Sequence, residues 1–321
     1  MRNVLVMAPD GVMDSALALT LDTLSAAHQL SGAEGPDFRA TLFCPGVSEI
    51  RTRQGARFDV AGRVAPGRFD ALVIPGLGLS TRDEIGTFFD DPQRASLVAW
   101  LHRHGPRVPR VAAGCSAVFL LAEAGLLRGR RATTTWWLGS VFRERYPDVD
   151  LDETQMVVED RGVVCAGAAL AQIDLMLHLL ARLGTPGLVR AVARSLAIEE
   201  RPTQARYMMR ASMSGQSDDV VRIERWMRRQ RHRPFSLAEL ARAVGMSPRT
   251  VDRRVREATG HGAKKLAQRI RLEHAAHLLQ TSRLALDEVA GRVGYRDPNT
   301  LRRLLKRELG VNPSQLRREA G

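Results

Sequence analysis

The residue best placed for covalent chemistry is Cys115, which stands at a predicted tight turn between a strand and a helix within Arg110–Leu121. A thiol at the N-terminus of a helix is stabilised as thiolate by the helix dipole and by free backbone amides. A cysteine hydrolase also needs a general base within hydrogen-bond reach of the thiol, usually a histidine. No histidine directly follows Cys115, and no motif ties to it the histidines of the first 200 residues, which are His28, His102, His104 and His178. Catalysis by Cys115 is therefore not expected.

Three interpretations of Cys115 remain open. It lines the wall of a pocket around a bound effector, it is an inert buried side chain, or it is a thiol that senses oxidants or electrophiles. The alternative function, a cysteine-dependent amidohydrolase or deglycase, would need the base that the sequence does not supply. Cys44 and Cys165 read as strand residues, and the spacing of the three cysteines favours neither a disulfide framework nor a metal site. We expect no cofactor and no metal.

A second candidate for chemistry is a pair of short helices near the C-terminus. Ser236 and Glu239 have the spacing of a capping box, which opens a helix that Gly245 ends. Ser247-Pro248 then supplies an N-cap with proline at the first helical position, and the next helix runs to Thr259 before Gly260. Helix, glycine turn and helix within 24 residues predict a helix-turn-helix.

The same outline recurs about fifty residues later. Leu286–Val293 is a predicted helix, Gly294 a turn, and Asp297-Pro298 the start of a helix that Gly310 ends. The segment between the copies, Lys264–Gln280, reads as one long connecting helix. If both second helices face the same side, they could enter successive turns of the major groove, about 34 Å apart.

The distribution of charge supports a nucleic-acid partner. The formal net charge is +13, yet residues 1–217 carry 24 Lys+Arg against 23 Asp+Glu, while residues 218–321 carry 24 against 12. A neutral segment therefore precedes a basic one, and a basic domain is the electrostatic footprint of a nucleic-acid binder. The alternative, an arginine-rich surface caused by biased composition, should have affected both halves equally.

The first 180 residues alternate short β-type runs with helical patterns, and this order predicts an α/β domain of the flavodoxin-like type, a parallel sheet with helices on both faces. Each predicted strand ends near glycine or proline. The predicted strands are Asn3–Ala8, Arg39–Cys44, Ala71–Pro75 and Arg110–Ala113, and the helices between them are Ser15–Leu30, Pro92–His104 and Ala117–Ala124. A hairpin at Met156–Glu159 and Val163–Cys165 and an apolar helix over Ala169–Leu183 close the domain. One amphipathic helix around Leu188–Leu196 and a polar linker over Glu199–Ser217 follow.

The C-terminal segment, Pro234–Arg318, resembles the AraC/XylS family of transcription regulators. The resemblance is carried by the stretches 240–247, 249–254, 289–297 and 301–313, although Leu301 and Leu305 stand where the family pattern has phenylalanine. The resemblance implies base-reading positions at Arg249, Asp252, Arg253, Asn299, Thr300, Arg302 and Arg303. Arginine pairs with guanine, asparagine with adenine and aspartate with the cytosine amine. Phosphate contacts are expected from Arg254, Arg256, Lys306 and Arg307.

The front segment resembles the PfpI/ThiJ superfamily, relatives of class I glutamine amidotransferases, through Phe69–Gly76 and Arg110–Leu121. With Leu121–Leu127, Ala132–Trp136 and the basic segment behind it, the whole chain is similar to the GlxA-type subfamily of AraC regulators. Relatives with a Thr-Thr-His-Trp sequence have histidine where Thr135 stands, and Asp14 is the nearest candidate for their acidic residue, two residues out of register. The resemblance implies an effector pocket formed by Gly76, Gly78, Cys115, Ser116, Thr135 and Trp136.

These observations predict a sequence-specific DNA-binding transcription regulator, an activator rather than an enzyme, controlled by a small-molecule effector. We expect a sensing domain over 1–185, a helix and linker over 186–217 and a DNA-binding domain over 218–321. The expected partners are double-stranded DNA, the effector, RNA polymerase and a second copy in a homodimer. No stretch approaches a membrane span and the first residues do not form a signal peptide, so we expect a cytoplasmic protein without membrane contact.

Overall fold

The computed structural model describes residues 1–31, 35–198, 204, 218–259, 261–309 and 311–318. The chain divides into two compact units, Met1–Gln204 and Ala205–Gly321, which are described separately here. Gly260 and Gly310, expected to end helices, and all of the expected linker Glu199–Ser217 except Gln204 lie outside the described residues. No helix among the described residues is both long and apolar enough to cross a membrane.

The first unit is built on a six-stranded sheet with the order β2-β1-β5-β6-β10-β9. Its strands are β1 (Arg2–Met7), β2 (Phe38–Phe43), β5 (Ala71–Ile74), β6 (Val111–Gly114), β9 (Val157–Asp160) and β10 (Val163–Ala166). All neighbouring pairs are parallel except β10 with β9, where Val163 pairs with Asp160 and Ala166 with Val157. The predicted parallel sheet and the predicted hairpin are both confirmed, with strand boundaries shifted by at most one residue.

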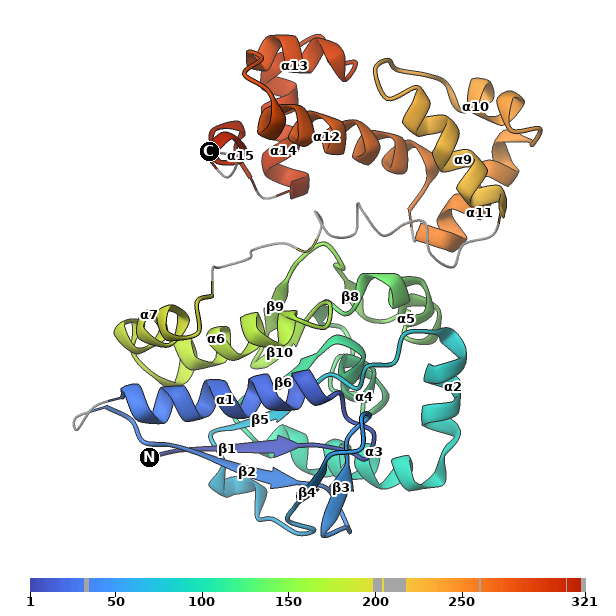
Figure 1. Cartoon of the computed structure of the whole chain (residues 1–321). Coiled ribbons are helices and arrows are strands. Elements are labelled where there is room, and N and C mark those ends of the chain that lie inside the picture. Colours follow the sequence, from blue (N-terminus) through green and yellow to red (C-terminus); the bar gives the residue numbers. More distant parts are fainter. Residues whose placement is uncertain (32–34, 199–203, 205–217, 260, 310, 319–321) are drawn as a thin grey trace. The chain divides into compact units, whose positions relative to one another are not determined.

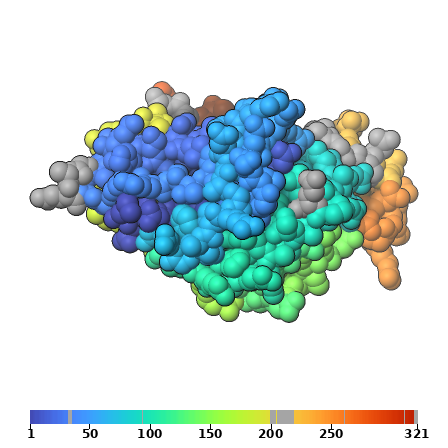
Figure 2. Space-filling view, turned by 90° about the horizontal axis from the view of Figure 1, so that it is seen from below, coloured from blue at the N-terminus to red at the C-terminus, as the bar shows by residue number. Residues whose placement is uncertain are grey.

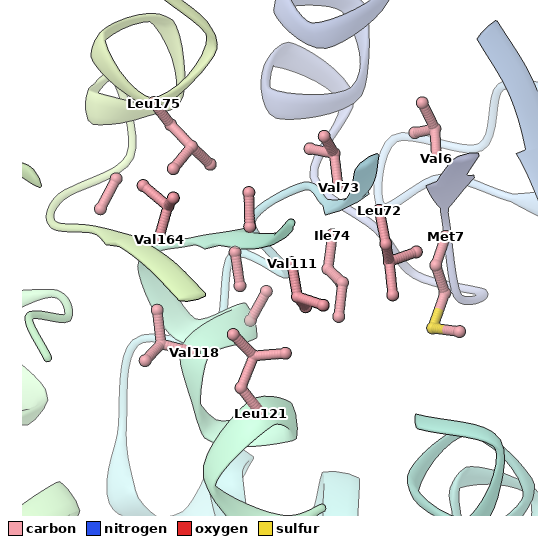
Figure 3. Close-up of a cluster of buried hydrophobic side chains, with 14 of the residues drawn as sticks. Val6, Met7, Leu72, Val73, Ile74, Val111, Val118, Leu121, Val164 and Leu175 are labelled. Carbon is pink, nitrogen blue, oxygen red and sulfur yellow. The ribbon is translucent and has the colours of Figure 1, made fainter. Parts of the chain in front are cut away.

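Helices cover both faces of this sheet (Figure 1). On one face pack α1 (Asp14–Leu30), α6 (Ala171–Leu183) and α7 (Pro186–Ser195), and on the other lie α3 (Pro92–His104) and α4 (Val118–Glu123). Figure 3 shows the core between them, with Leu175 of α6 on one side of the strand residue Val164 and Val118 and Leu121 of α4 on the other. The fold class is therefore the flavodoxin-like α/β arrangement that the alternating pattern predicts.

Several smaller elements surround the sheet and were not predicted. They are the hairpin of β3 (Glu49–Arg51) and β4 (Arg57–Asp59), the short pair β7 (Arg131–Ala132) and β8 (Asp150–Leu151), α2 (Arg82–Asp90) and α5 (Gly139–Arg145). In the space-filling view, the light-blue residues that include β3 and β4 lie beside the teal residues of α2 and α3 (Figure 2). The 3.0 Å ion pair between Arg53, in the turn between β3 and β4, and Glu84 of α2 agrees with that neighbourhood.

The second unit is entirely helical in its described residues. Its helices are α9 (Asp218–Arg229), α10 (Leu237–Ala243), α11 (Pro248–Thr259), α12 (Ala263–Thr281), α13 (Leu286–Arg292), α14 (Pro298–Leu309) and α15 (Pro313–Arg318). Two hydrophobic clusters share α12: Ala263–Ile270 packs with α9, α10 and α11, and Leu272–Leu279 packs with α13, α14 and α15. One helix thus belongs to both cores, as the long apolar-periodic segment predicts.

Candidate DNA-contacting helices and the buried Cys115 turn

The first helix-turn-helix consists of α10 and α11. The hydroxyl oxygen of Ser236 accepts a hydrogen bond from the backbone N of Glu239 at 3.1 Å, and the Glu239 carboxylate faces the Ser236 amide, so the predicted capping box is formed. Gly245 follows α10 with a φ of +68°, which glycine adopts without steric cost. Ser247 caps α11 by accepting from the backbone N of Thr250 at 3.1 Å.

Opposite faces of α11 have opposite character. Val251 and Val255 are buried in the core, whereas the side chains of Arg249, Arg253 and Arg256 are exposed. An exposed ion pair of 2.7 Å joins Arg253 to Glu257 one turn later. Exposed pairs of this kind contribute little stability and are readily exchanged, so the arginines on this face remain available to a phosphate or a base.

Two residues expected to contact DNA have partners inside the protein. The carboxylate of Asp252 accepts hydrogen bonds from the backbone N of Ala263 at 2.8 Å and from Arg256 at 2.9 Å, and these two interactions lower the pKa of Asp252. Arg254 forms an ion pair with Asp219 of α9. The carboxylate of Asp252 therefore caps the connecting helix, and the guanidinium of Arg254 fastens α11 to α9.

The second helix-turn-helix, α13 and α14, repeats this construction. Gly294 has a φ of +75° in the turn. Asp297 caps α14, since its carboxylate accepts from the backbone N of Asn299 at 3.0 Å and of Thr300 at 2.9 Å. The Thr300 hydroxyl donates to the same carboxylate at 2.7 Å and is the main reason that the pKa of Asp297 is lowered. Thr300, predicted to read a base, thus has its hydroxyl engaged in the cap.

The outer face of α14 is basic. Leu301, Leu304 and Leu305 are buried, and the exposed side chains are Asn299, Arg302, Arg303, Lys306 and Arg307. Hydrogen bonds within the helix orient two of these arginines. Arg302 donates to Asn299 Oδ1 at 3.2 Å, and Arg303 donates to Thr300 Oγ1 at 3.4 Å. The same helix therefore offers both the amide and guanidinium groups that bind base edges and the cations that bind phosphate.

The connecting helix α12 ties the two halves together through polar contacts as well as through its apolar faces. Its 19 residues give a length of about 28 Å. Glu273 on α12 pairs with Arg228 of α9 at 2.7 Å, and Lys265 on α12 pairs with Glu308 of α14. A ring contact of 4.9 Å between the Arg271 guanidinium and Tyr295 adds a tie to the second turn. A single packed helix, α12, therefore connects the half that contains α11 to the half that contains α14.

In the α/β unit, Cys115 stands where the sequence places it, in the sharp turn between β6 and α4. Its φ is +54°, a left-handed conformation that is costly for a residue with a Cβ. The side chain is 3% exposed, and burial raises the pKa of the thiol, although the neighbouring groups of Ser116 and Thr135 act in the opposite direction. At neutral pH the thiol is therefore protonated, and the expectation of a stabilised thiolate does not apply to this turn.

Several of the expected pocket residues gather around this turn. A Cβ placed on Gly76 would lie 3.2 Å from the Cβ of Cys115, so the glycine lets the two strand ends approach closely. Ser116 is fully buried and its hydroxyl accepts from the backbone N of Leu79 at 3.1 Å, and the hydroxyl of Thr135 is buried beside the thiol. Gly78, with a φ of +70°, accepts from Arg53 through its carbonyl, and Trp136 stacks edge-on against Trp137 at 5.2 Å.

The groups that could act as a base for Cys115 have other partners. Asp14 accepts from the Thr52 hydroxyl at 2.5 Å and from the backbone N of Gln54, and these hydrogen bonds hold the pKa of Asp14 below its ordinary value. Ala16, two residues on, approaches the same glycine, since a Cβ placed on Gly76 would lie 3.6 Å from the Cβ of Ala16 and 3.2 Å from that of Cys115. His28 pairs with Asp37, and His178 pairs with Glu159. His102 contacts the carbonyl oxygen of Ala124, and the ring of His104 packs against Trp100.

One residue near this site lies in the segment that the sequence predicts to be a linker. Gln204 is fully buried in the α/β unit, and its side chain contacts the backbone of Thr134, whose hydroxyl in turn donates to the Cys115 carbonyl at 2.8 Å. A polar residue within a polar stretch carries no periodicity that would reveal such burial. Only the fold brings residue 204 beside residue 134.

Comparison with known families assigns both units. The family model described as DJ-1/PfpI matches residues 2–182, and the model described as a helix-turn-helix domain matches residues 240–319. Among solved structures, a Vibrio parahaemolyticus protein described as a transcriptional regulator has a TM-score of 0.50 at 20% identity, covering 61% of this chain and 98% of that one. At this identity the likeness concerns the fold alone.

Two relatives are similar over most of their length. The chain is 28% identical over 307 residues to the HTH-type transcriptional regulator GlxA of Rhizobium meliloti, covering 95% of this chain and 92% of that protein. It is 30% identical over 234 residues to the HTH-type transcriptional regulator CdhR of Pseudomonas aeruginosa, covering 70% of this chain and 68% of that protein. The likeness to GlxA therefore extends over both units.

Proposed function

The chain belongs to the DJ-1/PfpI family and carries a helix-turn-helix domain behind that fold, and we propose that it is a sequence-specific DNA-binding transcription regulator. The observation that carries the proposal is the pair of capped helices α11 and α14, each with a buried apolar face and an exposed basic face, built on the shared helix α12. Both relatives named above are transcriptional regulators, which agrees with this function.

The proposed DNA contacts follow the exposed side chains of each helix. Bases are read by Arg249, Arg253, Asn299, Arg302 and Arg303, and phosphates are held by Arg256, Lys306 and Arg307. We assign Asp252, Arg254 and Thr300 to the internal contacts described above and leave them out of this set.

The front unit is proposed to bind a small-molecule effector near the Cys115 turn. The sensing domain is proposed over 1–185 and the DNA-binding domain over 218–321, and α7 and Gln204 of the segment 186–217 between them pack on the front unit. The sharp turn between β6 and α4 lies beside Gly76, Ser116 and Thr135, which surround the thiol. We also propose that the protein is not an enzyme, because the Cys115 thiol is buried and neutral and the candidate bases have other partners. Activation through RNA polymerase and a homodimer formed by the front unit complete the proposal.

A mobility-shift assay with genomic fragments at physiological salt tests the function. We expect retention of a small set of fragments, and Arg249→Ala and Arg303→Ala should each relax discrimination at particular base pairs by a factor of about 10 to 100. Arg39→Ala, an exposed arginine of the α/β unit, is the matched control and should bind like the parent protein. Uniform binding to every fragment by the parent protein would refute sequence-specific recognition.

A further inference from the structure

Gln204 is the last residue of the α/β unit and is 0% exposed there. Its backbone N donates to the carbonyl of Thr154 at 3.0 Å, which fixes the main chain at the edge of the unit. The side chain then reaches inward rather than into solvent. Glutamine loses rotamer entropy when it is ordered in this way, so its contacts must compensate for that loss.

Both ends of the Gln204 amide are hydrogen-bonded. The Oε1 atom accepts from the backbone N of Ala168 at 2.8 Å. The Nε2 atom donates to the carbonyl oxygen of Glu153 at 2.8 Å, to that of Thr134 at 3.0 Å and to the hydroxyl oxygen of Thr133 at 3.3 Å. A buried amide whose oxygen and nitrogen are both hydrogen-bonded stabilises the fold, whereas an unsatisfied one would destabilise it.

The surrounding groups select a primary carboxamide by shape and by charge. A Cβ on Gly167 would lie 2.2 Å from the Oε1 atom of Gln204, so only glycine leaves room for the amide. A carboxylate would place negative charge against the carbonyl oxygens of Thr134 and Glu153, and an ammonium group would leave the Ala168 N–H without an acceptor. Of the carboxamide, carboxylate and ammonium groups, only the carboxamide can both accept from the Ala168 N–H and donate to the oxygen atoms of Thr133, Thr134 and Glu153.

The position of this amide connects it to the Cys115 turn. Thr134 accepts from Gln204 through its carbonyl and donates through its hydroxyl to the carbonyl oxygen of Cys115 at 2.8 Å. Thr134 is fully buried, so neither hydrogen bond is replaced by water. The amide and the strained turn are thus separated by a single residue.

We propose that Thr133, Thr134, Glu153, Gly167 and Ala168 form a primary-carboxamide binding site, the carboxamide slot, which the chain's own Gln204 occupies in this structure. A small molecule with a terminal carboxamide takes the same place and releases the last residue of the α/β unit. As a statement about the chemical class of the effector, this inference rests on the proposed function. The existence of the slot can be tested without DNA.

The experiment is chemical rescue of Gln204→Ala in the full-length chain, followed by thermal unfolding of the α/β unit. Removing the amide leaves the backbone contact to Thr154 in place and empties the slot, so we expect Tm to fall by about 5 °C. Acetamide, which reproduces the atoms lost from the side chain beyond Cβ, should restore most of the loss at about 100 mM, since binding to the native state alone raises Tm. Gln54→Ala removes an exposed glutamine and should change neither Tm nor the response.

Acetate and acetone are the discriminating ligands, because acetate lacks the N–H donor and carries charge, whereas acetone lacks the donor only. Rescue by acetamide alone supports the slot. Equal responses to all three ligands, or equal responses of the parent protein, Gln204→Ala and Gln54→Ala, overturn it. The double variant Gln204→Ala/Gly167→Ala fills the slot with a methyl group and should lose the rescue. If the parent protein binds DNA selectively while the rescue fails, only this inference is lost, whereas rescue without selective DNA binding overturns the proposed function alone.

Discussion

The carboxylate of Asp252 accepts a hydrogen bond of 2.8 Å from the backbone N of Ala263, the first residue of α12. The two residues are eleven positions apart and belong to different helices, so a side chain of the first recognition helix caps the helix that joins both halves. Gly262, the N-cap residue of α12, has no side chain that could do so. The orientation of α11 on α12 is therefore fixed by a side chain that the sequence suggests for base reading.

Asp252→Ala should destabilise the helical unit by about 1 kcal/mol, because α12 loses its cap. The measurement is urea unfolding together with hydrogen exchange at the Ala263 amide, which should become faster in the variant. Glu257→Ala, which removes an exposed carboxylate from the same helix, is the control and should leave both quantities almost unchanged. Unchanged exchange at Ala263 in Asp252→Ala would contradict the capping role.

The two turn glycines should respond differently to alanine. Gly245 has a φ of +68° and open space around its Cβ position, so Gly245→Ala should lower the free energy of unfolding by about 1 kcal/mol through backbone strain alone. Gly294 has a φ of +75°, and a Cβ there would also lie 3.1 Å from the backbone Cα of Arg233, so Gly294→Ala should lose more. Urea unfolding of both variants gives the comparison. A larger loss for Gly245→Ala would show that steric contact with Arg233 is unimportant.

Alkylation of Cys115 should be slow at neutral pH. Burial raises the pKa of the thiol in the folded protein, so the reactive thiolate is scarce there and becomes abundant only as pH rises through that raised value. Folding accordingly favours the protonated thiol. The effect on stability is absent below the pKa of the unfolded thiol, and the folded protein loses stability as pH rises from that value through the raised pKa of the folded thiol. Iodoacetamide labelling followed by mass spectrometry at pH 6, 7 and 9 measures the rates. Rapid labelling of the folded protein at pH 6 would instead support the redox-sensor or hydrolase interpretation.

Lys306→Ala should weaken binding to all DNA sequences by a similar factor and reduce the slope of log affinity against log salt by about one unit, because one released counterion is lost. Fluorescence anisotropy with a specific and an unrelated duplex, at several salt concentrations, measures both effects. Arg303→Ala should instead act mainly on the specific duplex. A sequence-selective effect of Lys306→Ala would move this lysine from the phosphate set to the base-reading set.

The sequence by itself determined the elements that depend on neighbouring residues. The capping box of Ser236 and Glu239, the turns at Gly245 and Gly294 and the cap at Asp297 involve partners within three positions, so their spacing is visible in the chain. The parallel sheet follows from alternating strand and helix patterns. The placement of Cys115 follows from the predicted tight turn between the strand β6 and the helix α4. The basic helices were predicted in the same way.

Only the tertiary structure decided which polar groups meet across the chain. The pairing of Asp252 with Ala263, the burial of Gln204 beside Thr134 and the neutral state of the Cys115 thiol depend on packing between elements. A side chain that is exposed on an isolated helix and one that caps a neighbouring helix have the same local pattern. The difference arises when burial removes water and leaves each polar group to find a partner that the fold supplies.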